Sequence, residues 1–183
     1  MVRDPGVRVI SSERTLASAG CLRLVAGKVE HTGRALALSD VLTAPLTERA
    51  CLAYRVVVDE PGFFGRSVIA REEAVAAFVL DDGSLVREIA RIEFGVEQSL
   101  SSGHLNEPSD RLQLFLFMHG QRHEDFVGLN RSLRYREWIL APGDRVRVRG
   151  KAEWEAAPDG RGGTFREPPR RLILYECAIF IGG

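Results

Sequence analysis

The segment 142–150 limits the fold of this chain more than any other part of its sequence. It begins with a Pro-Gly-Asp turn at 142–144 and continues as Arg-Val-Arg-Val-Arg up to Gly150. Proline presets one turn dihedral angle and glycine tolerates positive φ, so the first three residues predict a tight turn. The alternation that follows places Val146 and Val148 on one face and arginines on the other. This is the pattern of a half-buried β-strand.

Other short segments have the same strand character. The strongest is 51–58, which is rich in β-branched and aromatic residues. The Asp-Asp-Gly-Ser turn at 81–84 separates two apolar segments, 76–80 and 85–92, and predicts a hairpin. Many short strands separated by glycine and proline predict a mainly β fold. We expect a small Greek-key, OB-like β-barrel with one or two short helices.

The chain has 183 residues, which is enough for one domain with a real core. We expect an irregular or partly helical lead-in at 1–20 and a single β-barrel domain over 21–183. An elaboration of this domain is expected around 95–130. The closing strand at the C-terminal end is expected to kink at Glu176.

Five segments have less certain local patterns. Residues 31–34 predict a turn, and 98–110 predict a polar loop. Residues 67–77 fit either a strand or a helix, and 130–139 begin like a helix. The dense apolar run 111–118 fits a strand or a short buried helix, since period alone does not decide; an internal strand is favoured.

The charge balance excludes a general attraction to polyanions. The chain has 25 Lys and Arg residues against 25 Asp and Glu residues, so its formal net charge is zero. The charges are unevenly distributed, because residues 131–183 hold 11 basic and 7 acidic side chains. Ten of these basic residues are arginines, and arginine is suited to forked contacts with carboxylate or phosphate.

The three cysteines, Cys21, Cys51 and Cys177, form no CxxC pair and have no histidine at zinc-ligand spacing. They are expected to be reduced, buried thiols. No apolar run approaches the roughly 20 residues that cross a bilayer, and the first residues lack the apolar region of a signal peptide. We therefore expect no membrane insertion and a cytoplasmic location.

Several short motifs, taken in order, resemble the GIDE domain, which lies next to the membrane helices of mitochondrially anchored RING-type E3 ubiquitin ligases and also occurs in bacterial proteins. The matching positions, over roughly residues 25–155, are Gly27, Gly33, Ala44-Pro-Leu46, Cys51, Tyr54, Phe78-Val-Leu-Asp-Asp-Gly83, Glu137, Leu140, Gly143-Asp144 and Gly150. Three cysteines do not supply the two zinc sites of a RING. The resemblance therefore implies a β-rich interaction domain without ubiquitin-transfer activity.

Arginines near the C-terminal strands are the candidate partner-binding residues: Arg134, Arg136, Arg145, Arg147 and Arg149. They could form a basic strip for an acidic protein segment or for phosphate. The alternative is a solvated face paired across strands with Glu137, Glu153 or Glu155. We expect a non-enzymatic adaptor or regulatory module that binds a protein at this face or at a strand edge, which could also pair two copies into a homodimer. The second hypothesis is a single-stranded nucleic-acid-binding module.

Three smaller groups have chemical potential but favour structural roles. His119 and His123 lie four residues apart and could share a metal ion on a helix, yet a polar loop explains them equally well. Cys51 has arginines nearby in sequence, but its strand pattern indicates a packed thiol. Asp81 and Asp82 belong to a turn, where aspartate bonds to the backbone. The sequence therefore predicts no catalytic residue, no metal ligand and no cofactor.

Overall fold

The structure is a computed structural model that describes residues 23–25, 28–39, 41–62, 65–95, 99–105, 108–124, 131–156 and 170–181. The lead-in predicted for 1–20 lies outside these residues. In chain order the elements are β1 (Arg23–Val25), β2 (Lys28–Ala37), β3 (Leu42–Thr43), β4 (Ala50–Cys51), β5 (Ala53–Gly62), β6 (Gly65–Val75), β7 (Phe78–Leu80), β8 (Leu85–Val86), β9 (Ile89–Phe94), β10 (Ser99–Leu105), α1 (Asp110–Met118), β11 (Leu133–Leu140), β12 (Arg145–Ala156) and β13 (Arg170–Ile181).

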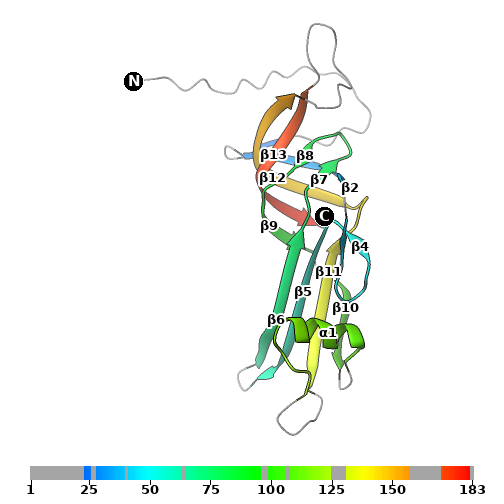
Figure 1. The fold of residues 1–183 in the computed structure, drawn as a ribbon. Coiled ribbons are helices and arrows are strands. Elements are labelled where there is room, and N and C mark those ends of the chain that lie inside the picture. The colour runs from blue at the N-terminus through cyan, green and yellow to red at the C-terminus, as the bar shows by residue number, and fades with distance from the viewer. Residues whose placement is uncertain are drawn as a thin grey trace.

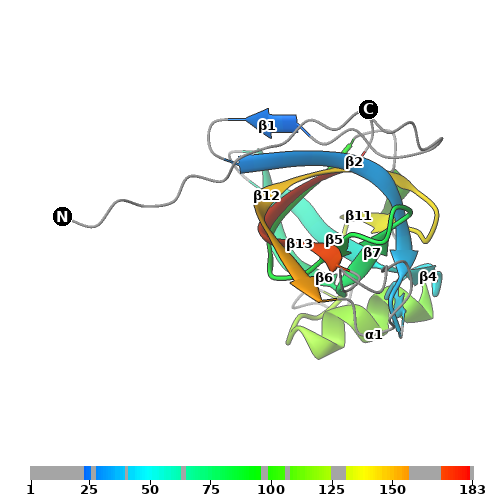
Figure 2. The ribbon, with the colours of Figure 1, turned by 90° about the horizontal axis from the view of Figure 1, so that it is seen from above.

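Five strands close into a barrel, seen from above in Figure 2. Their order around the barrel is β2, β7, β8, β13, β12 and back to β2. β8 and β13 are parallel, whereas the other neighbouring strands are antiparallel. Because β13 lies between β8 and β12, the barrel has the Greek-key arrangement of the OB fold. The predicted fold class is therefore confirmed. β1 and β9 extend the same sheet by pairing with β2 and β13.

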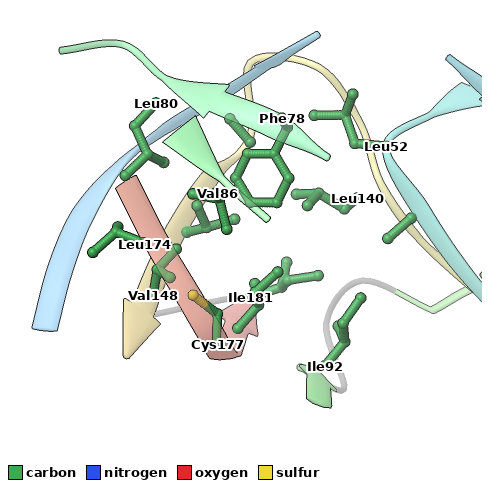
Figure 3. Packing of buried hydrophobic residues seen from close by; sticks show 14 of the residues in the cluster. Leu52, Phe78, Leu80, Val86, Ile92, Leu140, Val148, Leu174, Cys177 and Ile181 are labelled. Atoms are coloured by element: carbon green, nitrogen blue, oxygen red, sulfur yellow. The ribbon is translucent and has the colours of Figure 1, made fainter. Parts of the chain in front are cut away.

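The barrel interior is filled by apolar side chains from all of its strands. Val146 and Val148 are almost fully buried, while Arg145 and Arg147 on the alternate positions are exposed. This confirms the predicted alternation of β12. Figure 3 shows the ring of Phe78 among the buried aliphatic side chains. Burying each such side chain contributes roughly 1.5–3 kcal/mol to stability.

A bulge bends β13 where it crosses β12. The register shifts between Arg149 and Lys151, so Glu176 and Cys177 of β13 both lie opposite Gly150. Glu176 takes a left-handed conformation with φ 49°, which confirms the kink predicted there. An extra residue in one strand increases bending and twist, and it helps a short sheet to close into a barrel.

A second sheet is formed by the segments inserted between barrel strands. Its order is β10, β11, β5, β6; β5 and β6 come from between β2 and β7, and β10 and β11 come from between β9 and β12. Residues 67–77, which fitted either strand or helix, belong mainly to β6. Figure 1 shows these long strands extending away from the barrel, with α1 lying across them. A second apolar core packs between α1 and this sheet.

The apolar run 111–118 forms α1, so the favoured prediction of an internal strand is wrong. Ser109 caps the helix by accepting a hydrogen bond from the Leu112 backbone N–H at 3.4 Å. Leu112, Phe115 and Leu116 are buried against the sheet. Phe115 and Leu116 follow Leu112 by three and four residues, so all three lie on one face of the helix. This spacing cannot be recognised in the sequence, because the residues between them are also mostly apolar.

Three other predicted segments differ from the structure. Residues 31–34, predicted as a turn, lie inside β2, where Gly33 pairs with Val146. Residues 98–110, predicted as a loop, contain β10, and the helix-like beginning at 130–139 gives way to β11. In each case the backbone pairs with a strand that is distant in sequence. This tertiary pairing outweighs the local preference of polar residues for turns.

Candidate functional site

The outer face of α1 exposes three large apolar side chains, which we call the α1 patch. Leu114 is 52% exposed, Phe117 76% and Met118 75%. Phe117 and Met118 are the most exposed large apolar residues in the described part of the chain. Because both side chains are exposed to water, the protein does not gain the free energy that burying their apolar surface would provide. Grouped exposed apolar side chains of this kind mark binding surfaces.

A pocket of about 320 Å³ adjoins the α1 patch. It lies between α1, the segment 43–48 and β6. Its lining residues are Thr43, Ala44, Pro45, Glu48, Glu72, Arg111, Leu114, Phe115 and Met118. The volume is at the small end of the range for ligand pockets and suits a single side chain or a small molecule. Leu114 and Met118 belong to both the pocket and the patch, so the two form one continuous surface.

A buried glutamate holds the pocket wall in place. Glu137 of β11 is fully buried, and its carboxylate accepts hydrogen bonds from the backbone N–H groups of Leu46 (2.8 Å) and Thr47 (3.1 Å). The Thr47 hydroxyl donates to the same carboxylate. These three bonds compensate for burying the charge. They also fix the turn that begins at Pro45, which lines the pocket.

Glu72 of β6 supplies a carboxylate at the pocket. Its Oε1 accepts from the Tyr54 hydroxyl, and its Oε2 lies 3.4 Å from His119 Nε2. Burial raises the pKa of Tyr54, and the bond to Glu72 raises it further. The Nδ1 of His119 lies 2.8 Å from the Phe115 carbonyl oxygen. The ring is therefore held against the C-terminal end of α1.

The two histidines considered as metal ligands in the sequence contact different acidic residues. His119 contacts Glu72, while His123 lies 3.6 Å from its neighbour Glu124. Within the described ranges, no group of three histidine, cysteine, aspartate or glutamate side chains is placed to hold a metal ion. Asp125, which follows Glu124 in the sequence, lies outside those ranges.

The five candidate arginines do not form one strip. Arg145, Arg147 and Arg149 lie on β12 of the barrel, and we call them the barrel arginines. The guanidinium of Arg147 stacks 5.3 Å from the centroid of the Phe180 ring. Arg134 and Arg136 lie on β11 in the other sheet.

The alternative of a solvated arginine face is consistent with the exposure of Arg145 and Arg147, but the glutamates named as its partners have other contacts. Glu137 is buried beneath Leu46 and Thr47, Glu153 pairs with Arg87, and Glu155 pairs with Arg171. Arg134 and Arg136 instead share the carboxylate of Asp59. For the barrel arginines, no ion pair is formed with any residue that the structure describes.

The two cysteines in the described residues are packed thiols, as predicted. Cys51 and Cys177 are fully buried and unpaired with each other. Burial raises the pKa of Cys51 to about 11 and that of Cys177 to about 12. A thiol in this state is almost entirely protonated at neutral pH and is a poor nucleophile. Cys21 lies outside the described residues.

Asp82 has the turn role that the sequence predicted for it, and it also contacts a distant strand. It accepts from the Ser84 backbone N–H at 2.9 Å and hydroxyl at 3.0 Å. Its Oδ2 also lies 2.7 Å from Nε2 of the buried His31. Burial raises the pKa of Asp82, but the bonds from His31 and Ser84 outweigh it and lower that pKa to about 2. The turn is thus tied to β2.

This contact predicts a specific pH dependence of stability. The pKa of Asp82 in the folded protein lies below its ordinary value of 3.8. The contribution of ionised Asp82 to the free energy of unfolding is therefore complete above about pH 4 and is lost as the pH falls toward about 2. The shift corresponds to about 2 kcal/mol. We expect urea unfolding at a series of pH values to show a smaller acid loss in Asp82→Asn. Asp81→Asn, which leaves the His31 contact intact, is the control. An unchanged acid loss in Asp82→Asn would contradict this role.

Sequence reasoning did not identify Glu72 at the pocket or Asp59 as the partner of the arginines. Glu72 and Asp59 lie in strands without any local motif, and each acts through residues that are distant in the chain. Asp59 meets Arg134 across 75 residues of sequence, and Glu137 meets Leu46 across 91. The sequence singled out Glu137 through the resemblance to the GIDE domain and as a possible partner of the arginines, but not as the acceptor for Leu46 and Thr47. For Leu114, Phe117 and Met118 the signal was the apolar run itself.

Comparisons with known proteins add no neighbour. No helix in the described ranges is long and apolar enough to cross a membrane. No protein-family model, curated protein or solved structure matches this chain. The similarity to the GIDE domain therefore stays a prediction from the sequence.

Proposed function

We propose that this chain is a non-enzymatic protein-interaction module, an adaptor or regulatory subunit, that binds a partner protein at the α1 patch. The exposure of Phe117 and Met118 beside the pocket is the observation that carries the proposal. Interface energy concentrates in a few apolar or aromatic side chains that lose all contact with water. The α1 patch offers such side chains on a short, capped helix that packs on a sheet.

The pocket gives this surface a place for an anchoring side chain. A partner's apolar side chain would contact Leu114, Phe115 and Met118, while Glu72 and the ion pair of Arg111 with Glu48 would flank it. Glu72 also places β6 next to the pocket. β6 is a sheet edge of 11 residues that pairs only with β5 among the described strands. A partner strand could therefore add to β6 while a side chain fills the pocket.

The candidate chemical groups support binding rather than catalysis. Asp82 is committed to its turn and to His31, and Cys51 is buried with a raised pKa. The free state of Cys51 and Cys177 supports a reducing, cytoplasmic location. A non-enzymatic interaction domain is also what the resemblance to the GIDE domain implies.

Replacing the α1 patch tests the proposal. We expect Phe117→Ser with Met118→Ser to abolish capture of the partner from a nuclease-treated native extract. With the purified partner, the affinity should fall at least about 30-fold, because losing a central apolar anchor costs about 2 kcal/mol or more. Both side chains are exposed, so the circular dichroism spectrum and the melting temperature should stay close to those of the wild type.

The matched control is Trp154→Ser, which removes another exposed large apolar side chain, 66% exposed, from β12. Partner binding should survive this change. Equal losses in both variants would contradict the placement of the interface on α1. Light scattering after size exclusion identifies one special case: a dimer that only the α1 variant dissociates would make the partner a second copy of this chain.

Single-stranded nucleic acid is a second candidate, supported by the OB order of the barrel strands and by Arg147 stacked on Phe180. However, OB barrels use the face of their second and third strands, which are β7 and β8 here. Arg87, next to β8, is already paired with Glu153. The capture experiment separates the two functions, because a nucleic-acid-dependent complex disappears after nuclease treatment and weakens steeply with salt.

A further inference from the structure

A cluster of three arginines surrounds one buried carboxylate in the second sheet. The side chain of Asp59 is only 3% exposed. Its Oδ1 accepts from Arg66 Nε, and its Oδ2 lies 3.3 Å from Arg134 Nη2 and 3.1 Å from Arg136 Nη2. We call Arg66, Arg134 and Arg136 the Asp59 arginines. They come from β6 and β11, on either side of β5, which carries Asp59.

The Asp59 arginines lie on the sheet face that α1 does not cover. Arg134 is directly opposite Asp59 in the register of β11 and β5, and Arg136 lies two residues farther on the same face. Leu133 precedes Arg134 in β11 and therefore points to the opposite face of the sheet. It packs in the core that contains the buried side of α1. This surface is therefore separate from the α1 patch, and its test does not depend on the proposed interface.

The local charges do not balance. Among the residues that the structure describes, one carboxylate serves three guanidinium groups, which leaves an excess of about two positive charges. The neighbouring carboxylate of Glu60 does not offset this excess, because it is already paired with Arg131 at 2.5 Å. Burial raises the pKa of Asp59, but the bonds from Arg66 and Arg134 outweigh it, so the pKa of Asp59 is lowered and the carboxylate stays ionised.

The arginines keep donors for a further acceptor. The side chains of Arg66, Arg134 and Arg136 are 26%, 35% and 34% exposed. Each guanidinium has five N–H donors, and one carboxylate uses only part of this set. Nε of Arg136 is buried and has no partner among the described residues. The guanidinium of Arg136 also lies 5.2 Å from the centroid of the Trp138 ring, which helps to hold its plane.

We propose that the Asp59 arginines form a binding site for a phosphate monoester, presented by a phosphorylated side chain of a protein. A phosphorylated side chain carries about −1.5 to −2 charges and three acceptor oxygens near neutral pH, which matches the excess charge and the forked donors. A phosphodiester of nucleic acid carries only one charge for each group. Asp59 acts in this site as the residue that positions the three guanidinium groups.

Titration of the full-length wild-type protein tests the site directly. Backbone amide shifts are followed by NMR while phosphoserine is added at constant ionic strength, with serine plus sodium chloride as the blank. We expect saturable shifts at residues 59, 66, 134 and 136. The response should weaken as the pH falls below about 6, where the phosphate loses its second charge. Shifts that the sodium chloride blank reproduces would overturn the proposal.

Variants assign the response to the arginines. We expect Arg136→Gln to weaken phosphoserine binding about tenfold, because a hydrogen bond to a charged group contributes about 1.5 kcal/mol. Arg145→Gln removes an exposed arginine from the barrel and should leave binding unchanged. A wild-type affinity in Arg136→Gln, or an equal loss in Arg145→Gln, would show that phosphate is attracted by surface charge alone.

Two further ligands separate the sources of phosphate. A phosphoserine peptide should bind at the Asp59 arginines more tightly than its unphosphorylated form. Single-stranded DNA of similar total charge should give weaker, strongly salt-dependent shifts without a preference for this site. If DNA binds the Asp59 arginines more tightly than the phosphopeptide does, the assignment to a phosphorylated protein is wrong.

Discussion

Gly150→Ala is expected to lower the free energy of unfolding by about 3 kcal/mol and the melting temperature by about 10 °C. A Cβ at Gly150 would lie 2.7 Å from the Cys177 sulfur and 2.7 Å from the Tyr175 carbonyl oxygen. The second contact is with backbone, which does not rotate away. Relief requires β12 and β13 to separate at the bulge that closes the barrel. Urea unfolding and thermal melts measure the loss.

Gly120→Ala is the matched control. Gly120 has a left-handed φ of 67°, but an added Cβ there would meet nothing within 4 Å. Only backbone strain opposes the change, at about 1 kcal/mol. The two variants therefore distinguish crowding from conformational strain. If Gly150→Ala costs no more than Gly120→Ala, the close approach of β12 to β13 is not a constraint on stability.

Glu137→Ala is expected to cost about 3 kcal/mol or more. The change leaves the buried N–H groups of Leu46 and Thr47 without their acceptor and opens a cavity under the turn. Glu137→Gln keeps one acceptor oxygen and should lose about half as much. Urea unfolding at neutral pH gives the free energies. Hydrogen exchange at the amides of Leu46 and Thr47 reports whether the turn itself has loosened.

Glu153→Ala is the control for an exposed glutamate. Its side chain is 51% exposed and pairs with Arg87 at the surface, so its loss should cost less than about 1 kcal/mol. Equal effects at Glu137 and Glu153 would contradict the buried clamp. Because the turn at 45–47 forms one wall of the pocket, Glu137→Ala should also weaken binding at the α1 patch even where the protein remains folded.

The second sheet presents two different surfaces. One face packs against α1, whose outer side exposes the α1 patch. The opposite face carries the Asp59 arginines. A phosphorylated partner that engaged both surfaces would have to wrap around an edge of this sheet, and the edge strand β6 holds both Arg66 and Glu72. The affinity of the partner for the Phe117→Ser, Met118→Ser variant and for the Arg136→Gln variant shows whether one partner uses both surfaces.

The sequence by itself determined the fold class and several strands. The alternation of Val146 and Val148 with arginines, and the Asp-Asp-Gly-Ser turn at 81–84, were sufficient because these signals depend on neighbouring residues. Apolar alternation and turn chemistry act over a few positions, so they can be read from a short segment. The kink at Glu176 was predicted on the same local basis.

Only the tertiary structure decided which residues meet. It placed Arg134 and Arg136 on Asp59 instead of beside the barrel arginines, and it turned the apolar run 111–118 into a helix with one buried and one exposed side. Pairing across 75 or 91 residues depends on how whole strands choose neighbours in a sheet. The pairing that forms is the one that minimises the free energy of the entire core. It cannot be recognised in a short segment of sequence, because a strand with suitable alternation fits several neighbours equally well.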